Sequence, residues 1–424
     1  MPRNSPAVLV LYHYLYPDEV VSSVHFTELC QGLAERGWRV TGSACNRGCR
    51  DDSKIYPKRS TWKDIEFSRV WRPRFRQSSM LGRMLNALWM IFAWSLMAMK
   101  PGVSTDVVII GTDPVLSPVV ALAWKLFKPK VRFVHWCFDL YPEAAIAGGV
   151  LDEQSWFCTA LKRLLGLAYK HCSLIVDIGI CMRGRLEKYG SNARVATITP
   201  WALTEPDRPA PIDPVERYGL FGDASLGLLY SGTYGQAHSS RGIPELARAL
   251  GPKGGRITFT VQGNAADHLR ESFKNSGVPI DFMPVAPSAQ LATRLAAADV
   301  HIVTLREDWS GTVVPSKFFG ALAVGRPVLF VGSRESAIAQ WIEELQIGWV
   351  LHPENIDAVV NKLVGLSRDQ DAKTRLFAHC HRTYRERFSQ NRALDSWDLA
   401  LRGLFPSLAV EQPMAEARHA ATTR

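Results

Sequence analysis

The residues best suited to chemistry lie in the segment 312–331, where a polar loop leads through Pro315, Ser316 and Lys317 into an apolar strand. Proline is favoured in the first turn of a helix because its missing N–H would have no partner there, so the sequence predicts a short helix beginning near Pro315. Backbone N–H groups at a helix start, beside a hydroxyl and an ammonium group, suit an anionic phosphate. We therefore expect Pro315, Ser316 and Lys317 to bind the phosphate of a ligand such as a sugar nucleotide.

A second candidate is the glycine-rich loop SGTYGQAHSSRG at 231–242, which follows an apolar strand. Gly232 and Gly235 would let the backbone approach a phosphate closely, and Arg241 supplies a cation with several donors. Glycine-rich turns after strands are common, so a structural turn and a phosphate cradle are equal alternatives for this loop alone. Its place in the same half of the chain as Lys317 favours the cradle.

A third candidate is the acidic motif FDLYPE at 138–143, at the end of an apolar strand. Strand alternation places His135, Cys137 and Asp139 on one face. Asp139 and Glu143 would then stand where a carboxylate can hold or deprotonate an acceptor hydroxyl. In the alternative interpretation, Asp139 caps the next turn and His135 is a satisfied core residue.

The elements that must position these loops alternate between strand and helix. This rhythm predicts an α/β fold with parallel, doubly wound sheets, in which ligands bind at the carboxyl ends of the strands. A proline-rich segment at 200–226 divides the chain into an N-terminal domain at 1–200 and a C-terminal domain at 201–380. We expect helices at 381–406 that pack back on the first domain, and a disordered tail at 407–424. The predicted strands lie at 7–15, 39–46, 106–112, 131–138, 174–180, 226–235, 256–263, 281–285, 299–305 and 326–332.

Composition narrows the class of protein. The chain has 424 residues, of which 47% are hydrophobic and 21% charged, as in a globular protein of more than one domain. Its eight cysteines are scattered without a CxxC pair, and no secretory signal is visible, so a reduced, cytoplasmic protein is expected. No spacing of His, Cys and Asp suits a metal site, and we expect neither a metal nor a resident cofactor.

The net charge of +10 is concentrated between Lys54 and Lys100, where ten Lys or Arg stand against Asp64 and Glu66. The apolar run at 85–99 ends this segment and contains two tryptophans. A basic patch beside such a run is typical of a surface that rests on anionic lipid, although a core helix behind a solvated loop is an equal alternative. A membrane-spanning helix is disfavoured because the uncharged run is shorter than the roughly 20 residues that a bilayer needs. Nucleic acid is not expected, because no binding module is recognisable.

Four motifs together resemble the retaining glycosyltransferases of family 4, in particular those that make bacterial cell-surface polysaccharides. They are FDLYPE, ITPWA at 198–202, YSGTYGQAH and VVPSKFFGALAVGRPV, and they extend over nearly the whole chain. The resemblance implies the GT-B fold, in which two Rossmann-like domains face each other across a cleft. Gly320, Thr312 and Gln236 depart from the pattern, because many members carry two Glu and an Arg at these positions.

By position, the resemblance implies that Gly232 and Thr233 face the donor diphosphate and that Arg241 is a nearby cation. Ser316 and Lys317 would form the donor-binding turn, and Asp139 and Glu143 would line the acceptor side.

The activity expected from this resemblance is transfer of a hexose, with retention of configuration, from a nucleotide diphosphate sugar to a lipid-linked saccharide acceptor. Arg241, Lys317 and loop N–H groups would stabilise the leaving diphosphate. The enzyme would lie in the cytoplasm, peripheral on the inner face of an anionic membrane. The alternatives are a sugar-nucleotide 2-epimerase of similar fold and a catalytically weak GT-B scaffold protein.

Overall fold

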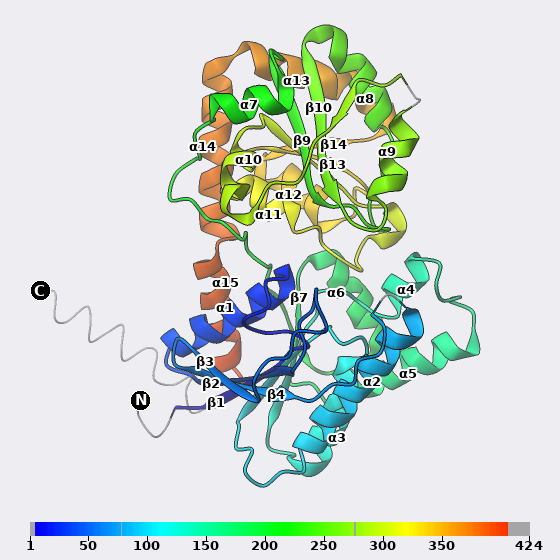
Figure 1. The fold of residues 1–424 in the computed structure, drawn as a ribbon, viewed down its shortest axis with the longest axis vertical. Helices are drawn as coiled ribbons and strands as arrows, with labels where there is room; N and C mark the ends of the chain where they lie inside the picture. Colours follow the sequence, from blue (N-terminus) through cyan, green and yellow to red (C-terminus); the bar gives the residue numbers. More distant parts are fainter. Residues whose placement is uncertain (1–4, 78, 275–276, 406–424) are drawn as a thin grey trace, which may run out of the picture.

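The computed structural model describes residues 5–77, 79–274 and 277–405, so the tail predicted at 407–424 lies outside the described residues. The chain forms two α/β domains, each built on a parallel sheet covered by helices (Figure 1). The strand orders are β3-β4-β2-β1-β5-β6-β7-β8 in the first sheet and β11-β10-β9-β12-β13-β14 in the second. The predicted fold class of two Rossmann-like domains is confirmed.

The first sheet is parallel except for β3, which pairs antiparallel with β4 at one edge. Its central strands are buried along their whole length, as expected for a parallel sheet with helices on both faces. The strands are β1 (Ala7–Leu11), β2 (Arg39–Cys45), β3 (Arg59–Trp62), β4 (Ile65–Val70), β5 (Val107–Gly111), β6 (Arg132–Trp136), β7 (Leu174–Asp177) and β8 (Arg194–Thr197). The helices of this domain are α1 (Val21–Glu35), α2 (Met80–Met97), α3 (Val120–Phe127), α4 (Glu143–Ala147), α5 (Trp156–Lys170) and α6 (Ile180–Leu186).

The second sheet is parallel throughout. Its strands are β9 (Leu226–Thr233), β10 (Gly255–Gln262), β11 (Ile280–Phe282), β12 (Val300–Thr304), β13 (Val328–Val331) and β14 (Gly348–Leu351). Its helices are α7 (Pro214–Phe221), α8 (Ile243–Leu250), α9 (Ala266–Lys274), α10 (Leu291–Ala296), α11 (Lys317–Ala323), α12 (Ala337–Leu345) and α13 (Ile356–Arg368). Helix α7 lies in the segment expected to be only a connection, and it forms because Asp213 caps its first turn by accepting from the Glu216 N–H.

The two domains are joined again by the last helices. Helix α14 (Gln370–Arg387) packs on the second domain, and α15 (Gln390–Arg402) runs down beside α1 of the first (Figure 1). Gly32 of α1 leaves room for Leu394, whose side chain would lie 2.4 Å from an added Cβ. The Trp397 ring meets Trp136 of β6 at 5.1 Å between centroids. The final helix therefore completes the core of the N-terminal domain.

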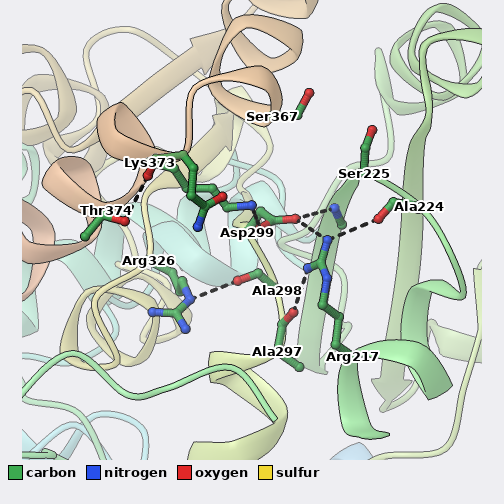
Figure 2. A network of polar contacts seen from close by, with 12 residues as sticks. Arg217, Ala224, Ser225, Ala297, Ala298, Asp299, Arg326, Ser367, Lys373 and Thr374 are labelled. Atoms are coloured by element: carbon green, nitrogen blue, oxygen red, sulfur yellow. Dashed lines mark hydrogen bonds and ion pairs between the residues drawn. The ribbon is translucent and has the colours of Figure 1, made fainter. Parts of the chain in front are cut away.

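A buried charge network fixes the amino-terminal edge of the second sheet (Figure 2). Asp299, which precedes β12, is 0% exposed and accepts from the backbone N–H of Gly227 at 2.7 Å. Its carboxylate also pairs with Arg217 of α7 at 2.9 Å and with Lys373 of α14 at 2.6 Å. The network therefore holds two helices against one sheet, at the edge opposite to the loops expected to bind ligands.

Candidate functional site at the domain junction

The loops that follow the carboxyl ends of the two sheets meet at the junction between the domains. The Leu140 N–H donates to the Thr312 carbonyl at 2.9 Å, and the Arg185 side chain donates to the Ser310 carbonyl at 2.8 Å. Gln236, after β9, lies against Gly148, after α4. The FDLYPE motif and the loop leading to Lys317 are therefore neighbours in space.

Lys317 is the cation that the structure places at the tip of β9. Its Nζ lies 3.2 Å from His238 Nε2 and 5.2 Å from the centre of the Tyr230 ring. Burial lowers the pKa of Lys317 to about 8. In the described part of the chain, no carboxylate forms an ion pair with this ammonium group. Its positive charge is therefore available to an anionic ligand.

His238 keeps a hydrogen-bond acceptor turned toward Lys317. Its Nδ1 lies 2.7 Å from the Thr304 carbonyl, which can only accept, so Nδ1 carries the proton. Burial and the charge of Lys317 lower the pKa of His238 to about 3, and the imidazole is neutral at physiological pH. His238 therefore orients Lys317 by accepting a hydrogen bond, and it leaves the positive charge of Lys317 unneutralised. Sequence reasoning missed this histidine, although it lies in the YSGTYGQAH motif.

Glycine is required at Gly232 for two reasons. Its φ is +120°, and an added Cβ would lie 3.2 Å from Lys317 Cε. The neighbouring Thr233 is exposed at the end of β9. Gly235 has an ordinary φ, and an added Cβ would meet only Asn264 Oδ1, at 3.5 Å. The structure thus brings Gly232, Thr233 and Lys317 together, whereas Gly235 has no comparable constraint.

The predicted helix after Pro315 begins at Lys317, with Ser316 as its N-cap residue. Ser316 is exposed and makes no capping hydrogen bond, and Pro315 is buried. Because α11 has only seven residues, the Lys317 ammonium is a stronger source of positive charge than the helix terminus.

Arg241 lies apart from this cluster. It is exposed and lines a cavity of about 750 Å³ at the carboxyl ends of β12, β13 and β14, together with Arg306, His352 and Glu354. No contact between Arg241 and Lys317 is found within the described ranges. Arg241 thus lines this cavity, and Lys317 is not among the residues that line it.

On the N-terminal side of the junction, Asp139 is exposed at the end of the loop after β6. The Thr112 hydroxyl accepts from the backbone N–H groups of Phe138 and Asp139, which fixes this loop against β5. Although the residue as a whole is exposed, protein atoms surround its carboxyl group, and this desolvation together with the nearby charge of Asp113 raises the pKa of Asp139 to about 6. Asp139 is therefore a carboxylate whose charge changes slightly below neutral pH.

A second carboxylate, Asp113, follows β5 and pairs with His13 after β1, at 2.9 Å between Oδ1 and Nδ1. Burial alone would lower the pKa of His13, but the charge and hydrogen bond of Asp113 raise it to about 9. His13 is therefore a cation at neutral pH. Sequence analysis missed this pair, although both residues follow strands at the same sheet edge. Within the described residues, no group of three or more His, Cys, Asp or Glu is placed to hold a metal ion.

Two residues that were expected to be catalytic, His135 and Glu143, form contacts away from Asp139. His135 is 1% exposed, its Nδ1 bonds to the Ile110 carbonyl at 3.1 Å, and burial lowers its pKa to about 4. This interior position argues against the catalytic role that the sequence suggested. The Glu143 carboxylate accepts from the Tyr189 hydroxyl at 2.8 Å and lines a separate cavity of about 740 Å³ beside α5. Glu143 therefore does not join Asp139.

An apolar surface covers one side of the N-terminal domain. Helix α2 is long and apolar enough to cross a membrane. Only 28% of it is buried within the protein, so most of its apolar surface is exposed. It connects β4 and β5 of one sheet, and Asn86, Met90 and Trp94 pin it to the domain, so it lies along the surface. Its exposed apolar side chains are Met80, Leu81, Met84, Leu85, Leu88, Phe92 and Leu96.

Two further helices extend this surface, which we call the α2–α3–α5 face. Helix α3 contacts both α2 and α5, and the three lie together on one side of the domain (Figure 1). Leu126 and Phe127 of α3 are exposed, as are Trp156, at 81%, and Phe157 of α5. Exposed cations stand among these side chains on all three helices, namely Arg83, Lys125 and Arg163. Sequence analysis did not assign α3 and α5 to this surface, because each carries a buried face as well.

The basic segment is less exposed than its composition suggests. Arg72 is 0% exposed and Arg69 is 9% exposed. Residues 59–70 form the β3–β4 hairpin, which sequence analysis did not predict; Arg69 lies in β4, and Arg72 follows it in the next segment. Two of the ten cations counted in this segment are therefore not available to an external surface.

Comparison with known proteins finds sequence similarity to glycosyltransferases. No family model matches it. It is 27% identical to the probable glycosyltransferase WbjE of Pseudomonas aeruginosa over 290 residues, which cover 67% of this chain and 71% of WbjE. It is 25% identical to WcaI of Escherichia coli K12, a putative colanic acid biosynthesis glycosyl transferase, over 135 residues, 31% of this chain and 33% of WcaI.

Solved structures confirm the GT-B fold. Sucrose-phosphate synthase of Thermosynechococcus elongatus superposes with a TM-score of 0.67 at 13% identity, over 95% of this chain and 100% of that one. HepE of Anabaena in complex with UDP gives 0.64 at 12% identity, over 94% and 100%. WaaG, a glycosyltransferase involved in lipopolysaccharide biosynthesis, gives 0.61 at 15% identity, over 93% and 99%. Together, the relatives and the fold support a glycosyltransferase of the GT-B type.

Proposed function

We propose that the chain transfers a hexose from a nucleotide diphosphate sugar to a lipid-linked saccharide in the synthesis of a surface polysaccharide. The observation that carries this proposal is the setting of Lys317, a partly buried cation that His238 holds against Gly232 and that pairs with no carboxylate among the described residues. It lies at the carboxyl ends of β9 and β12, where α/β sheets bind nucleotides. Two neighbours of similar fold, HepE structures, contain UDP and UDP-glucose, which supports a nucleotide-sugar donor here.

In the proposed reaction, the bond between the sugar C1 and the diphosphate oxygen breaks, and the nucleotide diphosphate leaves with the electron pair. Lys317 stabilises the charge that develops on this leaving group. The acceptor hydroxyl oxygen forms the new bond to C1, and its proton passes to the leaving diphosphate. Asp139, across the junction, accepts a hydrogen bond from the acceptor and holds it in place. No metal ion is needed in this scheme.

We further propose retention of configuration at C1, on the strength of the motifs shared with the retaining family. The acceptor must then approach from the side of the leaving group, which agrees with a scheme in which the diphosphate takes the proton. Proton NMR of the product, which distinguishes α- from β-linked sugars, tests this point against the configuration of the donor.

The location that we propose is the inner face of an anionic membrane, with the protein bound through the α2–α3–α5 face. Exposed apolar side chains beside exposed cations suit the boundary between headgroups and acyl chains. The basic residues flank the apolar stripe on each helix, as Arg83 does on α2 and Arg163 does on α5.

The experiment that tests the activity is incubation with a panel of nucleotide diphosphate sugars and a lipid-linked saccharide extract, followed by measurement of released nucleotide diphosphate and extended saccharide. Transfer from at least one donor, lost in Lys317→Ala, is the expected result. Epimerised donor without transfer would identify a 2-epimerase instead. Folded protein that binds no donor at all would leave only a scaffold role.

A further inference from the structure

The cavity beside α5, which we call the α5 pocket, has no part in the proposed reaction. Its volume is about 740 Å³, and it is lined by the start of α4, by α5 and by the residues that end at Tyr189. The lining residues of α5 recur every three or four positions from Thr159 to Lys170, so they share one face of that helix. At Gly166, an added Cβ would lie 3.5 Å from the Tyr189 carbonyl oxygen. Helix α5 and the segment around Tyr189 are therefore packed closely together.

A carboxylate oxygen without a partner lies in this pocket. Glu143 Oε1 accepts from the Tyr189 hydroxyl at 2.8 Å, whereas Oε2 is buried and has no hydrogen-bond partner among the described residues. The Tyr189 ring is held edge to face against Tyr169, at 5.1 Å between centroids, which fixes the hydroxyl group and the carboxylate bonded to it. A buried carboxylate oxygen that accepts no hydrogen bond is costly. Oε2 therefore calls for a donor such as a hydroxyl group.

The exposed part of the lining is basic. Arg163, Lys170 and Lys188 are exposed, and none of them forms an ion pair in the part of the chain that the structure describes. Lys162 also lines the pocket, but it is already paired with Glu153 at 2.8 Å. Three cations thus keep an uncompensated charge around one opening, and such a surface attracts an anion.

The two parts of the pocket require different groups of one ligand. A free phosphate or a small carboxylate would meet the cations, but its oxygens would be repelled by the buried oxygen of Glu143, because both can only accept. A neutral sugar would donate hydroxyl groups to Glu143 and leave the cations unpaired. A sugar that carries a carboxylate satisfies both parts, since it presents hydroxyl groups and an anion on one ring. Its carboxylate can form charge-assisted hydrogen bonds with Arg163.

The α5 pocket lies close to the acceptor side of the junction. Glu143 begins α4 four residues after Asp139, so the two Cα atoms are no more than about 14 Å apart. Between them, the Leu140 N–H donates to the Thr312 carbonyl of the second domain at 2.9 Å, which places this turn at the junction itself. A short saccharide can therefore bridge the distance between Asp139 and the pocket.

We propose that the α5 pocket binds an acidic sugar residue, such as a uronate, of the saccharide acceptor. This inference rests on the proposed function, because it names the chemical class of the acceptor for the same reaction. Glu143 accepts hydrogen bonds from the sugar hydroxyl groups, and the three unpaired cations surround the carboxylate. The sugar residue that receives the hexose lies at Asp139, further along the same saccharide. The pocket thus selects acceptors with a negative charge at a set distance from the accepting hydroxyl group.

The first test measures binding by NMR titration, with D-glucuronate as the probe. The comparator is D-glucose, in which a hydroxymethyl group replaces the carboxylate, and it should bind at least about tenfold more weakly. Glu143→Gln should weaken glucuronate binding about tenfold, as expected for hydrogen bonds to a charged group. Lys170→Gln combined with Lys188→Gln should weaken it about fivefold. This double variant changes only exposed side chains, so it keeps the test valid if Glu143→Gln alters folding.

The matched control is Lys253→Gln combined with Lys362→Gln. It removes two exposed lysines of the second domain for which the described residues offer no ion pair, and glucuronate binding should not change. Equal affinity in all variants, or equal affinity for glucose and glucuronate, would overturn the proposal. Glycerol 1-phosphate and phosphatidylglycerol vesicles test a lipid headgroup as another source of hydroxyl groups and an anion. If they bind through Lys170 and Lys188 and glucuronate does not, the assignment to a saccharide is wrong.

The second test examines the acceptor in the transfer reaction. Carbodiimide-activated reduction of a lipid-linked saccharide extract converts uronates into neutral sugars, and extract treated without the carbodiimide is the control. Transfer to the reduced extract should fall about tenfold. With untreated extract, Lys170→Gln combined with Lys188→Gln should raise the KM for the acceptor about fivefold and leave kcat unchanged.

The outcomes separate this inference from the proposed function. Equal transfer before and after reduction would show that the acceptor needs no acidic sugar, and the proposal would fall while the transferase activity stands. Absence of transfer from every donor, with glucuronate binding intact, would instead count against the proposed function and leave the α5 pocket as an acidic-sugar site without a role in transfer.

Discussion

At the scale of single residues, the site depends on Lys317, whose charge is tuned by its surroundings. The neutral His238 beside it accepts its hydrogen bond, and burial brings its pKa to about 8. An ammonium group with a lowered pKa still binds anions at neutral pH, but it loses its proton within the range where proteins are stable. The affinity of the donor site for an anionic ligand should therefore depend on pH in the alkaline range.

We expect the affinity for a nucleotide diphosphate to fall as the pH rises through about 8, because Lys317 is charged below its pKa and neutral above it. Calorimetric titration between pH 6.5 and pH 9.5 measures this dependence. Lys317→Arg, whose guanidinium does not titrate in this range, is the control and should flatten the profile. If the affinity of the wild type does not change with pH, Lys317 does not bind the diphosphate.

Replacing Lys317 with Ala should weaken donor binding by about 1.5–3 kcal/mol, the range for hydrogen bonds to charged groups. Arg241→Ala is the matched comparison, because Arg241 was expected to hold the same diphosphate but lines another cavity. We expect the smaller loss for Arg241→Ala. If Arg241→Ala proves the more damaging change, the donor diphosphate lies in the cavity of β12, β13 and β14 rather than beside Gly232.

Asp139 should control turnover more than donor affinity, because it lies on the N-terminal side of the junction. With its pKa raised to about 6, it is ionised above this pH and protonated below it. Turnover should therefore fall as the pH drops through about 6, and Asp139→Asn should lower turnover and abolish this acid limb. Rates measured from pH 5 to pH 8 with both proteins decide the matter. An Asn variant with the wild-type rate and profile would make Asp139 a structural residue.

At the scale of elements, the carboxyl ends of parallel strands explain why the sequence predicted so much of the site. Apolar runs of strand length gave β6, β9 and β12. Asp139 follows β6, Gly232 lies at the end of β9, and Lys317 begins the helix that follows β12. Whether a loop residue turns toward the junction depends on contacts that no local pattern encodes. His135 and Glu143 illustrate this limit, because their partners Ile110 and Tyr189 lie far away in sequence.

The same limit applies to the basic segment. Composition correctly located a basic region beside an apolar helix, but the β3–β4 hairpin within it carries Arg69 and Arg72 into the interior. Polar and charged residues alternate with apolar ones in this hairpin only over a few positions, too few to distinguish an edge strand from a loop.

Gly232 provides a prediction for the β9 loop. Gly232→Ala should weaken donor binding, because its φ of +120° is strained for a residue with a Cβ and the new methyl group would push against Lys317. Gly235→Ala is the control, since that position has an ordinary φ and free space. Donor affinities from calorimetry compare the two. Similar losses for both would show that the loop as a whole, and not the approach of Lys317, sets the affinity.

The α2–α3–α5 face predicts binding to anionic vesicles. Leu88→Asn with Phe92→Asn should reduce co-sedimentation with anionic liposomes, because both side chains are exposed on α2. Val215→Asn, which changes an exposed apolar residue of α7, is the control. Binding of the wild type should weaken as salt rises, since charges are screened over about 8 Å at physiological ionic strength. Equal pelleting of all three proteins would show that lipid does not contact this face.

At the scale of the whole molecule, the two domains are tied together far from the junction. Helix α14 is anchored on the second sheet by Lys373 and Asp299, and α15 continues from it into the core of the first domain. Any movement of one domain relative to the other must therefore bend the chain between these helices, near Phe388 and Ser389. The network around Asp299 fixes one end of this connection.

Asp299→Ala should lower the free energy of unfolding by about 3–5 kcal/mol, because it leaves the buried Lys373 and the partly buried Arg217 without their shared carboxylate. Urea denaturation followed by tryptophan fluorescence measures this change. Arg334→Ala, which breaks an exposed ion pair with Glu354, is the control and should cost about 0–1 kcal/mol. Since Asp299 lies at the sheet edge opposite to Lys317, donor affinity below the unfolding transition should be unchanged. A loss of donor affinity without a loss of stability would mean that the connection through α14 controls the geometry of the junction.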